Sequence, residues 1–265
     1  MSAIPRILAI GGSDSGGGAG IQADIKTVTA MGGYAATAIT AVTVQDTLGV
    51  HAVHAVPPDL IAAQIGAVLD DIGADAVKIG MVGDAAAFAA VARALAPHPA
   101  IPRIVDPVMA AKGGAALIDP AAIEGLRRLI EGAALVTPNA PEAAILTGQA
   151  VEDLDGQRAA ARALIASGAR AALVKGGHVP GPRVIDVLVS GAGETIFEGP
   201  RMETRHTHGT GCTLSSACAV GIARGLPLAE AVARAWAFTA EAIRNAPGFG
   251  RGAGPLGHAQ TERGR

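Results

Sequence analysis

Short β-branched runs alternate with longer segments rich in alanine and leucine along most of the chain. Within residues 19–31, Ile21, Ile25 and Val28 recur at the spacing of one helical face. Residues 34–44 are instead rich in Thr, Val and Ile, as extended strands are. Because alternating strands and helices favour right-handed crossovers, we expect a doubly wound α/β fold: a mostly parallel sheet with helices on both faces.

The pattern also predicts where the elements lie. Helices are predicted over residues 19–31, 57–72, 85–95, 120–130, 141–147, 157–167, 211–224 and 228–245. Strands are predicted over residues 6–10, 34–44, 76–81, 103–106, 134–137 and 171–175. Two further runs, 184–189 and 195–197, predict a short antiparallel hairpin at one edge of the sheet. Residues 1–258 are expected to form a single domain, and residues 259–265 a mobile tail.

Composition narrows the class of protein. The chain has 265 residues, of which 50% are hydrophobic and 17% charged, so it can bury a sizeable core and disorder is not expected. A net charge of -2 with 2% aromatic residues argues against a nucleic-acid surface. The first apolar run is too short for a secretory signal or a membrane span. Cys212 and Cys218 have the spacing of neither a zinc site nor a disulfide, and two free thiols suit the cytoplasm.

Unusual residues follow six of the predicted strands. In open α/β sheets, ligands bind beyond the carboxyl ends of the strands. Because all six segments fall on that edge, they predict one shared site. They are Gly11-Gly-Ser-Asp14, Gln45-Asp46, Gly80-Met81, Asp106-Pro107, Thr137-Pro-Asn139 and Gly176-Gly-His178.

The segment His206-Thr-His-Gly-Thr-Gly-Cys212 directly precedes an apolar helix. Glycines let backbone N–H groups approach a ligand, and a helix start adds unpaired donors and the positive end of its dipole. Such a nest suits an oxyanion or a phosphoryl group in transfer. Cys212 would lie in the first helical turn, where a thiolate is favoured. Taken alone, the segment could equally be a glycine turn followed by a small buried cysteine.

The glycine-rich segment Gly11–Gly20 lacks the dinucleotide-binding pattern, and no part of the chain matches a P-loop. Asp24 falls inside the apolar stripe of the following helix, where a carboxylate must be paired or hydrogen-bonded. Together with Gln45, at the end of the next strand, it could read the edge of an aminopyrimidine ring. A purely structural aspartate is the open alternative.

Three other segments carry groups suited to phosphate or metal chemistry. Asn139 and Glu142 share a helix face, so the carboxylate could hold magnesium or could belong to a capping box. Asp106 ends a strand and could serve catalysis, metal binding or only a turn. Lys175 could neutralise a phosphate as a point charge, or lie in solvent.

The histidines show no metal-ligand pattern. His206 and His208 lack a third ligand nearby, so zinc is not expected. The others are predicted to lie mostly at the surface: His51, His54, His98 and His258.

These segments occur together and in the order found in the hydroxymethylpyrimidine/phosphomethylpyrimidine kinases, which the chain resembles from Arg6 to about His258. The matching stretches are Gly11-G-S-D-S-G-G-G-A-G-I-Q-A-D24-I-K, Thr40-A-V-T-V-Q45, Lys78-I-G-M81, Asp106-P-V-M-A-A-K112, Thr137-P-N-A-P-E142, Val174-K-G-G-H178 and Thr207-H-G-T-G-C-T-L-S215.

The resemblance implies a ribokinase-like fold, ATP and Mg2+ as cofactors, and a homodimer. It implies phosphorylation of 4-amino-5-hydroxymethyl-2-methylpyrimidine, and then of its monophosphate, in thiamine biosynthesis. Positions that hold the pyrimidine are matched by Gly12, Asp24, Gln45, Met81 and Val108. The magnesium-side acids are matched by Asp106 and Glu142, and the nucleotide positions by Lys175, Thr207 and Asn139. The anion hole is matched by Gly209, Thr210, Gly211 and Cys212, with the cysteine in place of the Asp base of related sugar kinases.

The sequence departs from the family pattern at Asp46, His206 and Ala110, which affects substrate preference more than reaction class. Two alternatives stay open. A pyridoxal or pyridoxine kinase of the same fold would act on a similar hydroxymethyl-bearing ring, and a non-enzymatic sensor could bind the pyrimidine alone.

Overall fold

The structure, a computed structural model, describes residues 4–110, 118 and 120–259. In this part of the chain a nine-stranded sheet has the order β3-β2-β1-β4-β5-β6-β7-β8-β9. The strands are β1 (Arg6–Asp14), β2 (Tyr34–Gln45), β3 (Val50–Ala55), β4 (Ala76–Ile79), β5 (Arg103–Val105), β6 (Leu135–Val136), β7 (Ala171–Val174), β8 (Arg183–Ser190) and β9 (Gly193–Pro200). The predicted α/β fold is therefore confirmed.

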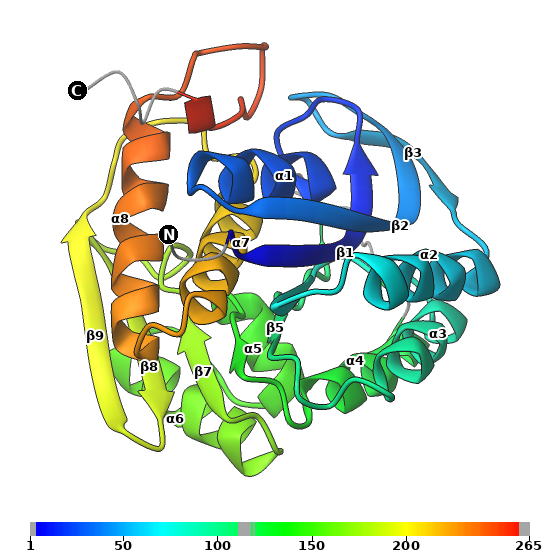
Figure 1. Cartoon of the computed structure of the whole chain (residues 1–265). Coiled ribbons are helices and arrows are strands. Elements are labelled where there is room, and N and C mark those ends of the chain that lie inside the picture. The colour runs from blue at the N-terminus through cyan, green and yellow to red at the C-terminus, as the bar shows by residue number, and fades with distance from the viewer. Residues whose placement is uncertain (1–3, 111–117, 119, 260–265) are drawn as a thin grey trace.

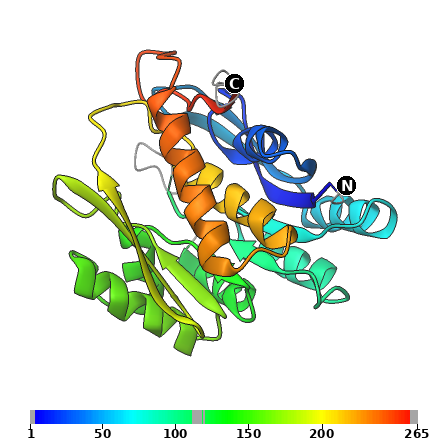
Figure 2. The ribbon, with the colours of Figure 1, turned by 60° about the vertical axis from the view of Figure 1, so that its left-hand side comes forward.

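Helices cover both faces of the sheet (Figures 1 and 2). One buried cluster joins the sheet to α2 (Pro58–Asp71), α3 (Ala85–Leu95), α4 (Ile123–Ile130), α5 (Ala140–Thr147) and α6 (Leu154–Ala166). The other joins the opposite face to α1 (Gly20–Ala30), α7 (Thr210–Ala223) and α8 (Leu228–Arg244). Strand β1 shows why: Ile7 belongs to one cluster, whereas Leu8 and Ile10 belong to the other, since side chains alternate along a strand.

Strands β2, β1, β4, β5, β6 and β7 are parallel, and antiparallel pairs close both edges of the sheet. The predicted hairpin is β8–β9. The second antiparallel edge, β3 against β2, was not predicted, because β3 is largely exposed and its residues show no apolar alternation. The chain moves outward from β1 to β2 and returns to β4, so the sheet order reverses beside β1.

Several predicted boundaries differ from the structure, and two of them bear on the site or on a helix start. The first strand extends beyond residue 10 to Asp14, with a change of register between Gly11 and Ser13, so the glycines lie inside the strand. The predicted helix 120–130 begins with a 3-10 turn, Pro120–Ala122, before α4. Lys112 of the matching stretch and residues 260–265 of the predicted tail lie outside the described residues.

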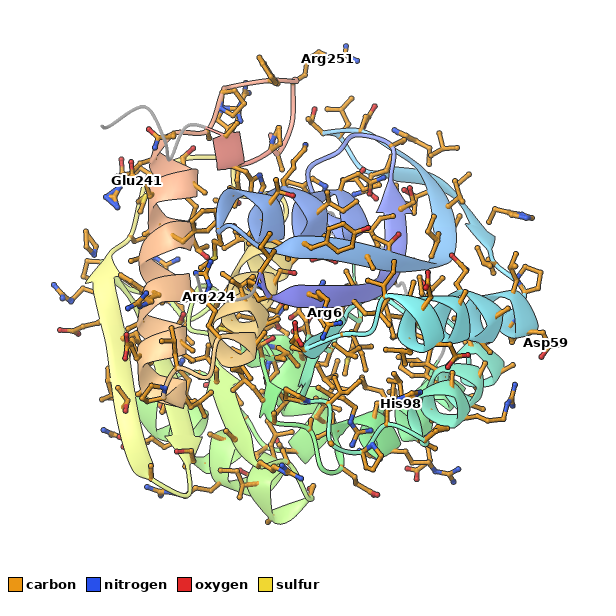
Figure 3. The ribbon with its side chains drawn as sticks, viewed as in Figure 1. Arg6, Asp59, His98, Arg224, Glu241 and Arg251 are labelled. Atoms are coloured by element: carbon orange, nitrogen blue, oxygen red, sulfur yellow. The ribbon has the colours of Figure 1, made fainter. Side chains whose placement is uncertain are left out.

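Charged side chains extend outward around this core, as Asp59 and Arg251 do in Figure 3. Among the described residues, every helix is too short or too polar to cross a lipid bilayer.

Candidate functional site

A cavity of about 590 Å³ opens at the carboxyl edge of the sheet, beside the reversal at β1. Its walls come from the ends of β1 and β2, the turns after β4 to β7, and the start of α7. The sequence-predicted residues that line it are Gly12, Gln45, Met81, Asp106, Val108, Asn139, Glu142, Lys175, Thr207, Gly209, Thr210, Gly211 and Cys212. Of the predicted site residues, Asp24 does not line the cavity.

The glycine nest forms at the start of α7. Gly209 caps the helix with φ 85°, a left-handed conformation that favours glycine, and a side chain there would collide with the carbonyl of Gly18. Thr210 Oγ1 donates a hydrogen bond of 2.8 Å to the carbonyl of Thr207, which holds the turn. The N–H of Thr210 donates to the carbonyl of Thr207 at 3.4 Å. The next N–H groups in the first turn of α7 have no carbonyl partner within the helix, so they can receive an anion.

Lys175, Asp106 and Glu142 face this nest. Lys175 Nζ lies 2.9 Å from Asp106 Oδ1, and Asp106 also accepts a 3.2 Å hydrogen bond from Thr137 Oγ1. A Cβ atom at Gly211 would lie 3.1 Å from Lys175 Nζ and 3.3 Å from Asp106 Oδ2. The ion pair therefore lies directly against the helix start, and glycine keeps that approach open.

Burial lowers the pKa of Lys175, but the nearby carboxylates of Asp106 and Glu142 outweigh it and raise that pKa. Glu142 is buried, which raises its pKa to about 7, with Asp106 adding to the rise and Lys175 opposing it. Its carboxylate accepts the N–H of Asn139 at 2.8 Å, while Asn139 Oδ1 accepts the N–H of Glu142 at 2.9 Å. The capping box that the spacing suggested is thus present, and it fixes this acid at the cavity wall.

The opposite wall is suited to a flat ring. A Cβ atom at Gly12 would lie 2.7 Å from Met81 Cε, so the end of the methionine side chain packs directly against the glycine. The carbonyl of Met81 accepts a 2.7 Å hydrogen bond from Thr40 Oγ1, which fixes that turn. Gln45 and Val108 complete this side of the cavity.

Asp24 lies beneath the cavity, not in its wall, so the prediction that it touches the ring does not fit this geometry. Its side chain is fully buried, and Lys78 Nζ contacts its two carboxylate oxygens at 2.8 and 3.0 Å. Ser216 Oγ donates a third bond of 2.7 Å. Burial lowers the pKa of Lys78, but Asp24, Cys212 and Asp106 outweigh it and raise that pKa.

Lys78 was missed as a site residue although it lines the cavity. A signal was available: a lysine inside the buried strand β4 and an aspartate inside the apolar face of α1 both need a partner. Pairing these two charges would have placed Asp24 correctly.

Cys212 lies in the first turn of α7 and is partly exposed. The expectation of a favoured thiolate is wrong, because burial raises the pKa of this thiol to about 11, against the lowering effect of Lys78. At neutral pH the group is therefore a thiol. Both Cys212 and Cys218 are free, as predicted.

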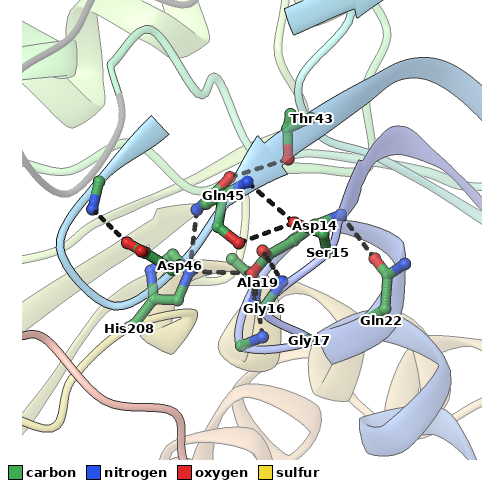
Figure 4. A network of polar contacts seen from close by, with 12 residues as sticks. Asp14, Ser15, Gly16, Gly17, Ala19, Gln22, Thr43, Gln45, Asp46 and His208 are labelled. Atoms are coloured by element: carbon green, nitrogen blue, oxygen red, sulfur yellow. Dashed lines mark hydrogen bonds and ion pairs between the residues drawn. The ribbon is translucent and has the colours of Figure 1, made fainter. Parts of the chain in front are cut away.

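A polar network at the ring side was also missed (Figure 4). It joins Asp14 at the end of β1, Gln45 at the end of β2 and His208 just before the nest. The structure also corrects the surface prediction for His258, which is 4% exposed and within 2.8 Å of Thr213 Oγ1.

A doubly wound sheet with a glycine nest facing a lysine and two acids defines a protein of the ribokinase-like class. Comparison with known proteins is more specific. The family model described as Phosphomethylpyrimidine kinase matches residues 14–257. The chain therefore belongs to the phosphomethylpyrimidine kinase family.

Individual relatives agree with this assignment. The hydroxymethylpyrimidine/phosphomethylpyrimidine kinase of Streptomyces coelicolor is 46% identical over 96% of this chain and 94% of its own length. The Thiamine biosynthesis bifunctional protein ThiED of Geobacter sulfurreducens is 49% identical over 95% of this chain, which spans only 52% of that longer protein. Among solved structures, the pyridoxal kinase of Staphylococcus aureus in complex with AMP-PCP and pyridoxal superposes with a TM-score of 0.90. The two are 30% identical, and the match covers 99% of this chain and 96% of the Staphylococcus aureus chain.

Proposed function

We propose that this chain transfers the γ-phosphoryl group of ATP to the hydroxymethyl oxygen of 4-amino-5-hydroxymethyl-2-methylpyrimidine, and then a second phosphoryl group to the monophosphate. One observation carries the proposal: a single cavity joins the ring-side residues Gln45 and Met81 to the nest Gly209–Cys212 and to Lys175. The near full-length relatives carry that activity in their names.

In the first transfer, a bond forms between the substrate's hydroxymethyl oxygen and the γ-phosphorus, the bond from that phosphorus to ADP breaks, and one proton is released. The nest and Lys175 stabilise the negative charge of the transferred group, and the cavity wall holds the alcohol in line with it. Because the transition state is loose, little charge develops on the attacking oxygen and no strong base is required. Cys212, a thiol at neutral pH, then serves as part of the nest.

Nucleotide binding is supported by the complex of the Staphylococcus aureus kinase with the ATP analogue AMP-PCP. We place the phosphates against Lys175, Thr207 and Asn139, which line the cavity near the nest.

Magnesium fits the acidic side of the site. Asp106 and Glu142 both line the cavity, and the charge of Asp106 helps to raise the pKa of Glu142. Among the described residues no three acids, histidines or cysteines converge to hold a metal on their own. We therefore expect the two acids to hold the ion together with the nucleotide phosphates, directly or through water. Bound there, magnesium would neutralise phosphate charge.

A sensor that only binds the pyrimidine would have no need of Lys175, Glu142 and the nest facing one another, so the enzyme is favoured. A pyridoxal kinase remains the second candidate, since a pyridoxal-bound kinase shares the fold. A cytoplasmic location and a homodimer stay predictions.

The test is ATP consumption by the purified chain with four acceptors: hydroxymethylpyrimidine, its monophosphate, pyridoxal and ribose. We expect turnover with the first two and weak or no turnover with ribose. Turnover with pyridoxal alone would establish the second candidate, and ring binding without turnover would establish the sensor.

A further inference from the structure

The side chain of His208 lies between the ends of β1 and β2, beneath the ring side of the cavity (Figure 4). The residue is 8% exposed. Its Nε2 atom is 3.0 Å from Asp14 Oδ2 and also 3.0 Å from the Nε2 atom of the Gln45 amide. One ring nitrogen thus faces a carboxylate and an amide together. Whether that nitrogen carries a hydrogen decides whether it donates to these two groups or accepts from them.

The surroundings of Asp14 place that proton. Its carboxylate accepts the backbone N–H groups of Gly16, Gly18 and Ala19 at 2.8 to 2.9 Å. Burial raises the pKa of Asp14, but the bond from His208 and those backbone bonds outweigh it and lower that pKa. Because the carboxylate is ionised and can only accept, His208 Nε2 must carry the hydrogen that lies between them.

The amide of Gln45 is then fixed from both ends. In the structure the NH2 end of the amide faces His208 and the oxygen faces Thr43. Two donors cannot share a hydrogen bond, so a protonated Nε2 requires the two ends of this amide to be exchanged, with the oxygen toward His208. The single Nε2 hydrogen is then shared between Asp14 Oδ2 and this oxygen in a three-centre bond. The other end lies 3.2 Å from Thr43 Oγ1. That hydroxyl donates its one hydrogen to the carbonyl of Ser13 at 3.0 Å, so it can only accept from the amide, which requires the NH2 group there. Two separate contacts therefore select the same amide orientation, an assignment made from the network because amide ends are interchangeable in shape.

We propose that His208 is a specificity-determining positioning residue, which fixes the Gln45 amide so that it presents an N–H donor and a carbonyl acceptor side by side to the bound ring. This rests on the proposed function, in which Gln45 reads that ring. One hydrogen of the NH2 group stays available after the bond to Thr43, and the oxygen keeps a second lone pair after the bond from His208. The pair matches a ring nitrogen beside an exocyclic amino group, which the aminopyrimidine has and pyridoxal lacks.

The test measures binding of hydroxymethylpyrimidine and of pyridoxal by calorimetry without nucleotide, so it does not depend on turnover. His208→Asn removes the N–H at the position of Nε2, whereas His208→Gln retains an N–H of about that reach. We expect His208→Asn to weaken pyrimidine binding by about threefold to tenfold, the range of one hydrogen bond, with a smaller change for pyridoxal. The preference for pyrimidine should return in His208→Gln.

Two further variants separate positioning from a general structural effect. In a Gln45→Ala background, His208→Asn should no longer change the pyrimidine-to-pyridoxal preference, because its effect passes through the amide. Thr43→Val, which removes the partner at the other end of the amide, should lower the same preference even if His208→Asn folds poorly. His206→Asn is the matched control, since among the described residues no hydrogen bond joins His206 to Gln45, and it should leave the preference unchanged.

The proposal is overturned if His208→Asn lowers binding of both rings equally, if its effect on preference persists in the Gln45→Ala background, or if neither ring binds the wild-type chain. Failure of the proposed function looks different. In that case the preference for pyrimidine and its loss in His208→Asn would be seen in binding, while ATP would not be consumed.

Discussion

Cys212 occupies the place where a proton acceptor would be expected, yet its thiol is held in the protonated form. Burial raises its pKa to about 11, and the neighbouring Lys78 offsets this only in part. The backbone of the nest, not the sulfur, is therefore the main contribution of this segment to anion binding. This changes what its substitution should do.

We expect Cys212→Ser to keep kcat within about tenfold of wild type, because the loose transition state needs little help from a base. The kcat of the wild-type enzyme should also show no rise of tenfold per pH unit between about pH 7 and 10. A steady-state pH profile of both proteins checks this. If the rate climbs with that slope in wild type and is flat in Cys212→Ser, the thiolate is the base after all.

Glu142 is the residue whose charge should govern activity near neutral pH. Burial raises its pKa to about 7, so the carboxylate is lost as the pH falls through that value. We expect Glu142→Gln to lower kcat and to remove an acidic fall in kcat/KM that the wild type shows near pH 7. Pyrimidine phosphorylation measured across pH 6 to 9 at a fixed magnesium concentration below saturation checks this, because bound magnesium competes with the proton on Glu142.

The buried carboxylate of Glu142 should also destabilise the fold above about pH 7. A pKa raised in the folded state favours folding below the unfolded value, and that contribution is lost as the pH rises through about 7. Glu142→Gln should therefore raise the free energy of unfolding at pH 8 by up to about 3 kcal/mol. Urea melts at pH 5 and pH 8 measure it, and an equal effect at both pH values would contradict the assignment.

At the scale of elements, one buried ion pair connects three of them. Lys78 of β4 contacts Asp24 of α1, and Ser216 of α7 donates to the same carboxylate. This pair lies under the nest, so the positive charge of Lys78 reaches Cys212 above it. Structural and electrostatic roles are thus combined in one contact.

Lys78→Met should destabilise the fold by about 3–5 kcal/mol, because it leaves the Asp24 charge buried without its partner. The double variant Lys78→Met, Asp24→Leu should recover most of that loss while kcat stays low, since the positive charge behind the nest remains absent. Chemical denaturation and steady-state kinetics on the three proteins decide. A double variant with wild-type kcat would show that Lys78 is structural only.

Most elements could be predicted from the sequence because their periodicity is local. Strand β3 could not, because its outward-facing residues carry no core pattern and it is held by backbone bonds to β2. The nest and the edge of the sheet were predictable for the same local reason. The partners of Asp24 and Gln45 were not, since Lys78 and His208 approach them from 54 and 163 residues away along the chain.

Across the whole molecule, the end of the described chain packs against segments that border the site. His208 N donates to the carbonyl of Gly254, and Ala253 N donates to that of Thr47 in the turn after β2. His258 then contacts Thr213 in the first turn of α7. The final segment, residues 248–258, thereby connects the ring side of the site to the nest.

This contact should make the protein sensitive to acid. Burial lowers the pKa of His258 to about 4, so it is neutral in the fold, and its contribution to stability is present above about pH 6.5 and is lost as the pH falls toward 4. Between these two pH values, the free energy of unfolding of the wild type should fall by roughly 3 kcal/mol more than that of His258→Asn. Urea melts at pH 4, 5 and 6.5 on both proteins check this, and parallel curves would contradict it.

The bond between Asp14 and His208 spans 194 residues of the chain. During synthesis, β1 leaves the ribosome long before His208 is made. The carboxylate of Asp14 therefore stays without this partner while the residues between them are translated. No nascent chain that ends before His208 can assemble both walls of the cavity. Catalytic competence should therefore appear only after α7 has emerged, and chaperones that shield early strands should affect its yield more than its final rate.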